Sequence, residues 1–482
     1  MTTGRASARE VIALVADDFG QFPDPPGGER SSLPDGPLGW PGYDASRERA
    51  ARRTGESESV VCGTASVQGT RAVLIAFEFG FLGGSLGERT GDRLEAAYTY
   101  AREHRLPIVP LVATGGSRMQ EGMLALTQLQ RVARQSALTR EAGLPQIAVL
   151  RDPTTGGGWA TLGAGADVVL ALPDAQVGFA GSRVRPPDAD PAAYTARAQV
   201  GAGAADALVS PAELRDVLGG WLRLLTDQSL REPATDTSVT ATTTSVTDTS
   251  ASDASTATDA PATSVAAAPV PAALGVCDLP RTGWEAVRRA RAPERPRARA
   301  YLDAYFTHRR AISGDRCGGV DPDGMLCGFG LHQGRTVAYA AQTGAATRPA
   351  GYRTATRLIR LADRLGIPVL TLVDTPGAAN DAEAERQGAG AAIAELFGVV
   401  ATARTPITTL VIGEGGSGGA LALAAPGRTW ATPDSYFSVI APESAAAILK
   451  RSPAETEATA GQLRIRPQDL AELGVIRITQ AR

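Results

Sequence analysis

An internal repeat is the feature that most constrains how this chain can fold. Residues 106–116 read LPIVPLVATGG and align with residues 367–377, IPVLTLVDTPG, so that Pro107 meets Pro368 at an offset of 261 residues. Pro145 meets Pro406 at the same offset, and two further segments align within one residue of it, 155–158 with 417–420 and 173–174 with 433–434. A nearly constant offset over four separated segments predicts two copies of one structural unit.

Each copy shows the same order of elements. A helical stretch (residues 94–104 and 353–365) leads into an apolar run that ends at a Thr-x-Gly turn. A second helical stretch (residues 119–140 and 383–403) is followed by another apolar run and a glycine cluster. The runs are apolar throughout rather than alternating, which is typical of strands covered on both faces. The pattern predicts an α/β fold.

Composition divides the chain into segments. Residues 232–274 are rich in Thr, Ser, Ala and Asp, and such a segment buries too little apolar area to offset its ordering entropy. We therefore expect a flexible linker there and a poorly ordered segment over residues 1–37, which are rich in Pro, Gly and charge. Two domains remain, at residues 38–231 and 275–482.

Charge and residue usage exclude several functional classes. Lys plus Arg (48) nearly balance Asp plus Glu (51), which gives no electrostatic reason to expect nucleic acid or an anionic membrane as partner. No apolar window is long enough to span a bilayer, and the N-terminus lacks the pattern of a signal peptide, so we expect a cytoplasmic protein. No metal-ligand spacing, and hence no zinc, is expected from the cysteines and histidines, which are Cys62, Cys277, Cys317, Cys327, His104, His308 and His332.

The glycine clusters are the candidate sites of chemistry. Residues 154–158 read TTGGG and residues 415–420 read GGSGGA, each directly after an apolar strand. Glycine leaves backbone N–H groups open to a close ligand, and a helix N-terminus adds the positive end of its dipole. Two N–H groups aimed at one oxygen form an oxyanion hole. One isolated cluster would fit tight strand–helix packing better, but two at equivalent positions favour binding.

The second cluster also matches two other patterns. Residues 415–419 form G-x-S-x-G, the nucleophile elbow of serine hydrolases, but no histidine follows Ser417 to complete a triad. Residues 413–418 form G-x-G-x-x-G, the dinucleotide motif, yet they lie far into their domain and Asp434 precedes a strand-like run. Neither pattern supports its usual function here.

At these residues the chain resembles the carboxyltransferase component of bacterial acetyl-CoA carboxylase. The first half resembles the β subunit at residues 77–87 (FEFGFLGGSLG), 114–122 (TGGSRMQEG), 152–157 (DPTTGG) and 178–181 (GFAG). The second half resembles the α subunit at residues 281–285 (RTGWE), 314–316 (GDR), 351–353 (GYR), 374–378 (DTPGA), 411–420 (VIGEGGSGGA) and 472–476 (ELGVI). The order suggests a natural fusion of the two subunits.

The resemblance implies two crotonase-like domains, each a spiral of ββα units, and catalysis by backbone amides. By motif position, one oxyanion hole at Gly156, Gly157 and Gly158 would stabilise the enolate of an acyl-CoA thioester. The other hole would hold the ureido oxygen of biotin. It comprises Gly418, Gly419 and Ala420, and the residues expected to bind substrate beside the two holes are Gly115, Gly116, Gly377 and Ala378.

The same resemblance implies partners. Carboxybiotin would donate a carboxyl group to an acyl-CoA such as acetyl-CoA, giving malonyl-CoA or a homologue for fatty acid or polyketide synthesis. The chain carries neither a Met-Lys-Met biotinylation motif nor an ATP-grasp domain, and its single lysine is Lys450. We therefore expect a separate biotin carboxyl carrier protein and biotin carboxylase. Because sites of this family form between an N-half and a C-half, often of different subunits, we also expect at least a homodimer.

Three departures from the family keep alternatives open. The β subunit's four-cysteine zinc ribbon is absent, residues 344–349 are short with Arg348 as their one basic residue, and residues 379–383 (ANDAE) replace a Pro-Gly-rich loop. A non-catalytic or regulatory partner of a true carboxylase is one alternative. An acyl-CoA decarboxylase or hydratase of the same fold is another, although Glu414 has no partner glutamate in the first half's cluster.

Overall fold

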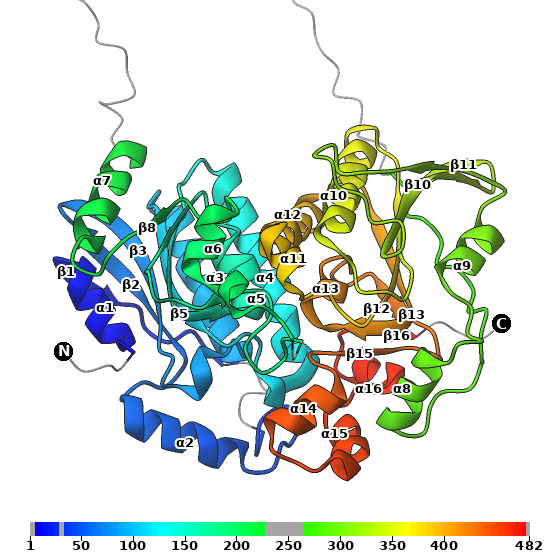
Figure 1. Cartoon of the computed structure of the whole chain (residues 1–482), viewed down its shortest axis with the longest axis horizontal. Helices are drawn as coiled ribbons and strands as arrows, with labels where there is room; N and C mark the ends of the chain where they lie inside the picture. The colour runs from blue at the N-terminus through cyan, green and yellow to red at the C-terminus, as the bar shows by residue number, and fades with distance from the viewer. Residues whose placement is uncertain (1–4, 28–32, 187, 227–264, 479–482) are drawn as a thin grey trace, which may run out of the picture.

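The computed structural model describes residues 5–27, 33–186, 188–226 and 265–478. Two α/β halves of similar size lie side by side, the first on the left of Figure 1 and the second on the right. Each half is built on one eight-stranded sheet.

The first half contains the following elements in chain order: α1 (Ala8–Val15), β1 (Asp18–Gln21), α2 (Tyr43–Thr54), β2 (Val60–Val67), β3 (Thr70–Phe77), α3 (Glu88–Glu103), β4 (Ile108–Thr114), α4 (Gly122–Glu141), β5 (Ile147–Thr155), α5 (Gly156–Gly158), η4 (Trp159–Gly163), β6 (Val168–Ala171), β7 (Val177–Gly178), α6 (Ala196–Gly201), β8 (Ala207–Leu208) and α7 (Leu214–Thr226).

The second half follows with these elements: α8 (Gly283–Arg291), α9 (Ala298–Tyr305), β9 (His308–Ile312), β10 (Met325–His332), β11 (Arg335–Gln342), α10 (Pro349–Arg364), β12 (Val369–Thr375), α11 (Ala382–Arg386), α12 (Ala389–Thr402), β13 (Ile407–Gly416), α13 (Ser417–Leu421), β14 (Thr429–Ala431), β15 (Tyr436–Ser438), α14 (Pro442–Ile448), α15 (Thr456–Gln462), α16 (Pro467–Glu472) and β16 (Arg477–Ile478).

The two sheets have the same topology. The first runs β1-β2-β3-β4-β5-β6-β8 with β7 on β5, and the second runs β9-β10-β11-β12-β13-β14-β16 with β15 on β13. In both, the first three strands are antiparallel and the rest are parallel. Strands β4 and β12 are buried along their whole length, as their uninterrupted apolar runs predict. The internal repeat and the predicted α/β fold are thus confirmed.

The antiparallel strands show that the repeat extends further than the sequence alignment did. Hairpins β2–β3 and β10–β11 turn at Gln68-Gly69 and Gln333-Gly334, and both residues of each pair have positive φ. Positive φ at both central residues is the geometry of the tight hairpin turn whose twist matches that of the strands.

The described residues extend beyond two of the expected boundaries. The described part of residues 1–37 is not poorly ordered throughout, because α1 buries Val11, Ile12 and Val15 in a core shared with β2 and β3. Most of the predicted linker lies outside the described residues. Packing of the second half begins before residue 275, since Ala268 is buried and its carbonyl accepts a hydrogen bond from Thr408.

The helix expected over residues 383–403 is two helices, α11 and α12. Gly388 separates them with a φ of 75°. A residue in the left-handed region cannot continue an α-helix, and the chain therefore changes direction there.

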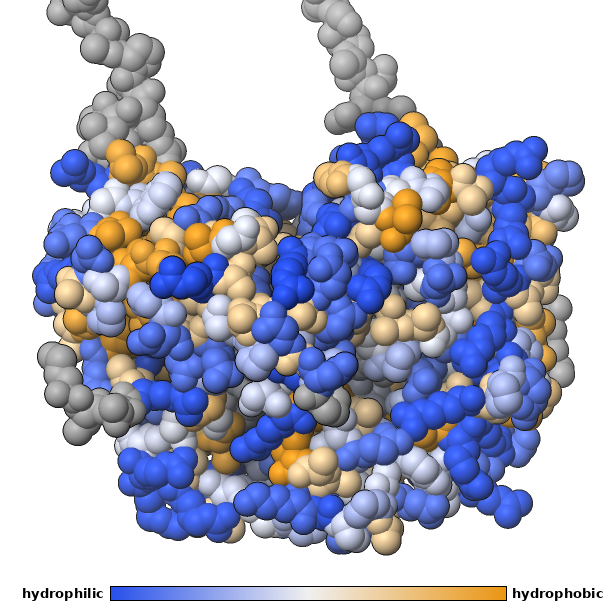
Figure 2. Space-filling model, viewed as in Figure 1, coloured by the Kyte–Doolittle hydropathy of each residue, from blue (hydrophilic) through white to orange (hydrophobic). Residues whose placement is uncertain are grey.

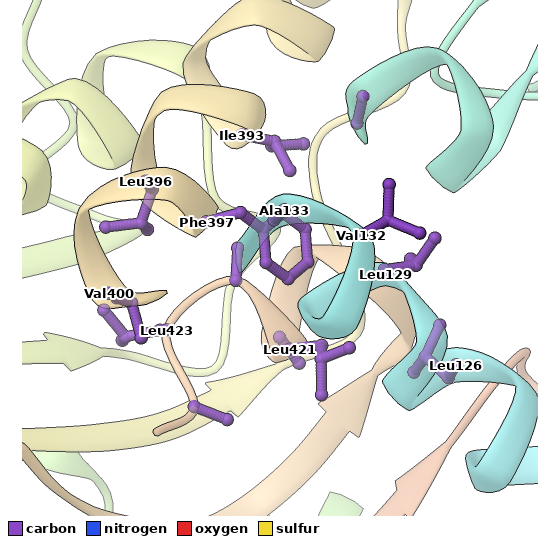
Figure 3. Packing of buried hydrophobic residues seen from close by; sticks show 14 of the residues in the cluster. Leu126, Leu129, Val132, Ala133, Ile393, Leu396, Phe397, Val400, Leu421 and Leu423 are labelled. Atoms are coloured by element: carbon purple, nitrogen blue, oxygen red, sulfur yellow. The ribbon is translucent and has the colours of Figure 1, made fainter. Parts of the chain in front are cut away.

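The halves meet through α4 and α12, which lie between the two sheets. Figure 3 shows Ala133 of α4 beside Phe397 of α12, with Val132, Leu129 and Leu421 nearby. One buried cluster includes all of these side chains, so the two halves share a hydrophobic core.

The surface is mixed in character. On the face seen in Figure 2, hydrophilic residues cover most of the area and hydrophobic residues appear in small separate groups. Among the helices that the structure describes, none is long and apolar enough to cross a membrane.

Candidate active site

Each glycine cluster forms the first turn of a short helix that directly follows a central strand. Strand β5 ends at Thr155 and α5 begins at Gly156, and likewise β13 ends at Gly416 and α13 begins at Ser417. The structure aligns Gly156 with Ser417, an offset of 261, so the sequence alignment of this segment at 262 was wrong by one residue. Gly156 and Ser417 share a left-handed backbone, with φ of 65° and 53°. The chain therefore reverses in the same way at both strand ends.

The amides of these first turns have no partner further back along their own helix. A capping side chain commonly fills this role, but neither helix has one. Thr155 precedes α5, and its hydroxyl donates instead to the carbonyl of Thr114 at 3.2 Å. Gly416 precedes α13 and carries no side chain. Neither helix start is therefore capped by a side chain of the residue before it.

Side-chain hydrogen bonds to carbonyl oxygens of the two clusters fix the orientation of their peptides. The carbonyl of Gly419 accepts from Tyr352 Oη at 3.1 Å and from Gln342 Nε2 at 3.2 Å. These bonds fix the peptide between Gly419 and Ala420. Ala420 is the fourth residue of α13, so its N–H points back along the helix toward Gly416, and the first-turn amides without a helical partner are those of Ser417, Gly418 and Gly419. In the first half, the hydroxyl of Thr161 donates to the carbonyl of Gly157 at 2.7 Å.

A second glycine turn lies beside each cluster. Gly116 and Gly377 have φ of 104° and 145°, and their N–H groups donate to the hydroxyls of Thr114 (3.0 Å) and Thr375 (3.2 Å). The carbonyl of Gly116 accepts from Leu86 N–H, and that of Gly377 accepts from Thr347 N–H. The two turns are therefore the same structure, built twice.

Within each half, the turn and the cluster are in contact. A Cβ placed on Gly156 would lie 3.3 Å from the Cα of Gly116, and one on Gly419 would lie 2.3 Å from the amide nitrogen of Ala378. The residues expected to bind substrate thus adjoin the proposed oxyanion holes in both halves.

The two clusters also approach each other across the interface between the halves. Leu129 Cδ1 lies 2.4 Å from a Cβ position on Gly157 and 3.6 Å from one on Gly418. Phe179, from the first half, lies 3.5 Å from the Gly418 position through its Cζ. The structure therefore brings both clusters together within a single chain.

Buried ion pairs support both turns. Arg118 follows the first turn and pairs with Glu58. Burial alone would raise the pKa of Glu58, but the charge and hydrogen bonds of Arg118 hold it at about 2. In the second half, Arg295 Nη2 donates hydrogen bonds to both carboxyl oxygens of Asp374, each at 2.9 Å. Burial nevertheless raises the pKa of that carboxyl.

Glu414 is occupied in structural contacts. It accepts from Arg291 Nε and from Tyr436 Oη, both at 2.8 Å, which ties α8 to β13. This arrangement gives no support to a hydratase, which needs a pair of free glutamates. Among the described residues, no group of three or more His, Cys, Asp or Glu side chains could hold a metal ion.

Sequence reasoning missed three residues at this site: Leu129, Phe179 and Glu385. Leu129 reads as one apolar position of a helix, and Glu385 as one charged position of the helix expected over residues 383–403. Residues 178–181 match a motif of the family, but the sequence gives them no role. Thr114 and Thr375 were visible in the repeat alignment, and their equal offset could have identified the shared turn.

Comparison with known proteins agrees with the geometry. Residues 41–230 match the family model "Carboxyl transferase domain", and residues 280–479 match "Acetyl co-enzyme A carboxylase carboxyltransferase-like". Over 89% of its length the chain is 38% identical to the acetyl-coenzyme A carboxylase carboxyl transferase subunits beta/alpha of Salinispora arenicola, covering 74% of that protein.

Two further proteins are similar. A probable biotin-dependent acyl-coenzyme A carboxylase beta3 subunit of Mycobacterium bovis is 33% identical, with 91% of this chain and 84% of that protein covered. Transcarboxylase 12S, solved as a hexamer with methylmalonyl-coenzyme A bound, gives a TM-score of 0.38 at 18% identity over 99% of this chain and 87% of the other. The chain belongs to the acetyl-CoA carboxylase carboxyl transferase family, biotin-dependent acyl-CoA carboxyltransferases, with its beta-type half before its alpha-type half.

Proposed function

We propose that this chain transfers the carboxyl group of carboxybiotin, carried on a separate biotin carboxyl carrier protein, to the α-carbon of acetyl-CoA or a short homologue. Biotin carboxylase would load the carrier. The observation that supports this most is the pair of uncapped helix starts, at Gly156 and Ser417, that approach each other across Leu129.

The chemistry assigned to the first half is stabilisation of an oxyanion. Removing the α-proton of an acyl-CoA places negative charge on the thioester oxygen. We assign the amides of Gly156, Gly157 and Gly158 to that oxygen, because fixed N–H dipoles in a water-poor site stabilise developing charge strongly.

The second half is assigned to biotin. We assign the amides of Gly418, Gly419 and Ala420 to a ureido oxygen. The support comes from Gly418 and Gly419, which lie in the first turn of α13, where N–H groups have no partner within the helix. When bound, carboxybiotin supplies the carboxyl group. The walls of the substrate site would be formed by Gly115, Gly116, Gly377 and Ala378. Both Gly116 and Gly377 have positive φ, which favours glycine and so leaves these walls without side chains there.

We further propose that one chain holds a complete site. The expected dimer followed from sites shared between subunits, whereas here Leu129 contacts both clusters of the same chain. In a homo-oligomer, each chain would then contribute its own complete site, and no site would be formed between chains.

The proposal is tested by incubating the purified protein with carboxybiotinylated carrier protein and acetyl-, propionyl- or butyryl-CoA. Carboxylated product is expected with at least one of the three. Absence of product with all three, under conditions in which the carrier binds, would favour the non-catalytic alternative.

Gly418→Ala gives a sharper version of this test. The new methyl group meets only ordinary contacts, 3.5 Å from Phe179 and 3.6 Å from Leu129, so the fold should tolerate it. It nonetheless narrows the proposed site, and we expect kcat/KM to fall at least about tenfold. Gly398→Ala, in open space on α12, is the matched control and should retain full activity.

A further inference from the structure

Residues 178–181, here called the bridging segment, touch both glycine clusters. The segment starts in β7, where Gly178 pairs with Thr155 of β5. A Cβ on Gly181 would lie 3.5 Å from Thr155 Oγ1, beside the start of α5. Phe179 lies against the Gly418 position in the other half. The β5–β7 pairing therefore anchors one end of the segment beside α5, and Phe179 sets the space beside the Gly418 cluster.

A carboxylate from the opposite half holds the bridging segment. Glu385 lies on α11, and its Oε1 accepts from the N–H of Phe179 at 2.6 Å and from that of Ala180 at 3.2 Å. Gly178 makes room for this approach, because a Cβ there would be only 3.1 Å from Oε1. The Glu385 side chain is 1% exposed, so water does not compete for these bonds.

Neighbouring contacts between the halves lie outside the bridging segment. Tyr194 Oη donates to the carbonyl of Asn380 at 2.5 Å, and Asn380 Nδ2 donates to the carbonyl of Val184 at 3.1 Å. Arg386 and Asp190 form an exposed ion pair at 2.8 Å. Together with the apolar core of α4 and α12, these contacts keep the halves joined when Glu385 is replaced.

We propose that Glu385 is a positioning residue for the carboxyl transfer: by holding the Phe179 and Ala180 amides it sets the gap between the bridging segment and the Gly418 cluster. This inference rests on the proposed function, in which the Gly418 cluster receives biotin. Glu385 itself does not touch the reacting atoms.

The surroundings of Glu385 make glutamine its proper conservative substitute. Burial raises the pKa of Glu385 to about 7, although the amides of Ala180 and Phe179, the Arg185 guanidinium and the Gln199 side chain act to lower it. Tyr194 also faces this carboxyl. An oxygen that accepts two amide bonds is present in the carboxylate, in the carboxylic acid and in a glutamine side chain.

The experiment compares Glu385→Ala and Glu385→Gln with Glu383→Ala, an exposed glutamate of the same helix. Two quantities are measured: amide hydrogen exchange of the peptide containing residues 178–181, and KM and kcat with carboxybiotinylated carrier and acetyl-CoA. In Glu385→Ala we expect faster exchange and a rise of at least about tenfold in KM for the carrier, with KM for acetyl-CoA unchanged. Glu385→Gln and Glu383→Ala should resemble the wild type in both.

Two results would overturn the inference. Wild-type exchange in Glu385→Ala would show that the carboxyl does not hold the segment, whatever the activity. An equal rise in KM for the carrier in Glu385→Gln and Glu385→Ala would show that the charge of Glu385, rather than its accepting oxygen, matters. If the wild type itself forms no product, the proposed function fails, and the exchange data still decide whether Glu385 holds the segment.

Discussion

At the scale of single residues, the two halves differ at the first residue of the short helix, which is Gly156 in one half and Ser417 in the other. Gly156 and Ser417 share the left-handed backbone, but only glycine adopts it without steric cost. Such strain in a residue other than glycine commonly accompanies a functional site. Ser417 therefore carries strain that its first-half equivalent avoids.

Ser417→Gly should relieve this strain. We expect the free energy of unfolding to rise by about 1 kcal/mol, as for other left-handed residues replaced by glycine. Urea unfolding of the variant beside Ser417→Ala measures the effect. Because alanine keeps the strain, a gain in both variants would contradict this explanation.

Glu385 gives a second prediction, which concerns pH. Its pKa in the folded protein is about 7, above the ordinary value of 4.5, so the folded state holds the proton more tightly than the unfolded state. The stability from this proton is present in full below about pH 4.5 and is lost as pH rises through 7.

Glu385→Gln should remove the loss of stability that accompanies deprotonation of Glu385. Relative to the wild type, the variant should gain about 3 kcal/mol in free energy of unfolding between pH 4.5 and pH 8. Thermal or urea unfolding across this range measures the difference. Parallel pH profiles for the two proteins would mean that Glu385 titrates normally.

At the scale of elements, the contact between α4 and α12 determines whether the halves act together. Phe397 of α12 lies beside Ala133 of α4 in Figure 3 and is 2% exposed. Leu129, one turn before Ala133, also touches both glycine clusters. Packing in this layer therefore sets the distance between the two helix starts.

Phe397→Ala should open a cavity in this layer. The expected loss is about 3–5 kcal/mol of unfolding free energy, with a fall in carboxyl transfer because the clusters move apart. Leu365→Ala is the control, since that leucine is 58% exposed at the end of α10 and should change stability by no more than about 0.5 kcal/mol. Equal effects of the two substitutions on stability would argue against a shared core.

At the scale of the whole molecule, the two halves of one chain enclose both clusters. If the site lies within one chain, a first-half defect and a second-half defect on different chains cannot compensate. If the site instead lay between two subunits, random pairing would restore about a quarter of the sites.

Co-expression of Gly157→Val and Gly418→Val chains distinguishes these arrangements. We expect no recovery of carboxyl transfer above either variant alone, measured on the purified mixture with both tags present. Recovery to about a quarter of wild-type activity would place the site between subunits.

The sequence alone determined the repeat, the α/β class and the strand–glycine–helix order of each half. These features follow from local periodicity and from glycine's backbone freedom, so they can be read along the chain. The matched turns at Gly116 and Gly377 belong to the same group, since one alignment relates them.

Only the tertiary structure decided how the halves meet and what closes the site. Phe179 and Glu385 are 206 residues apart, and nothing in the sequence near either one indicates the other. The position of Leu129 between two clusters, and the packing of α1 on the first sheet, likewise depend on which faces come together. Such contacts depend on the sum of burial over many distant residues, which no short sequence window contains.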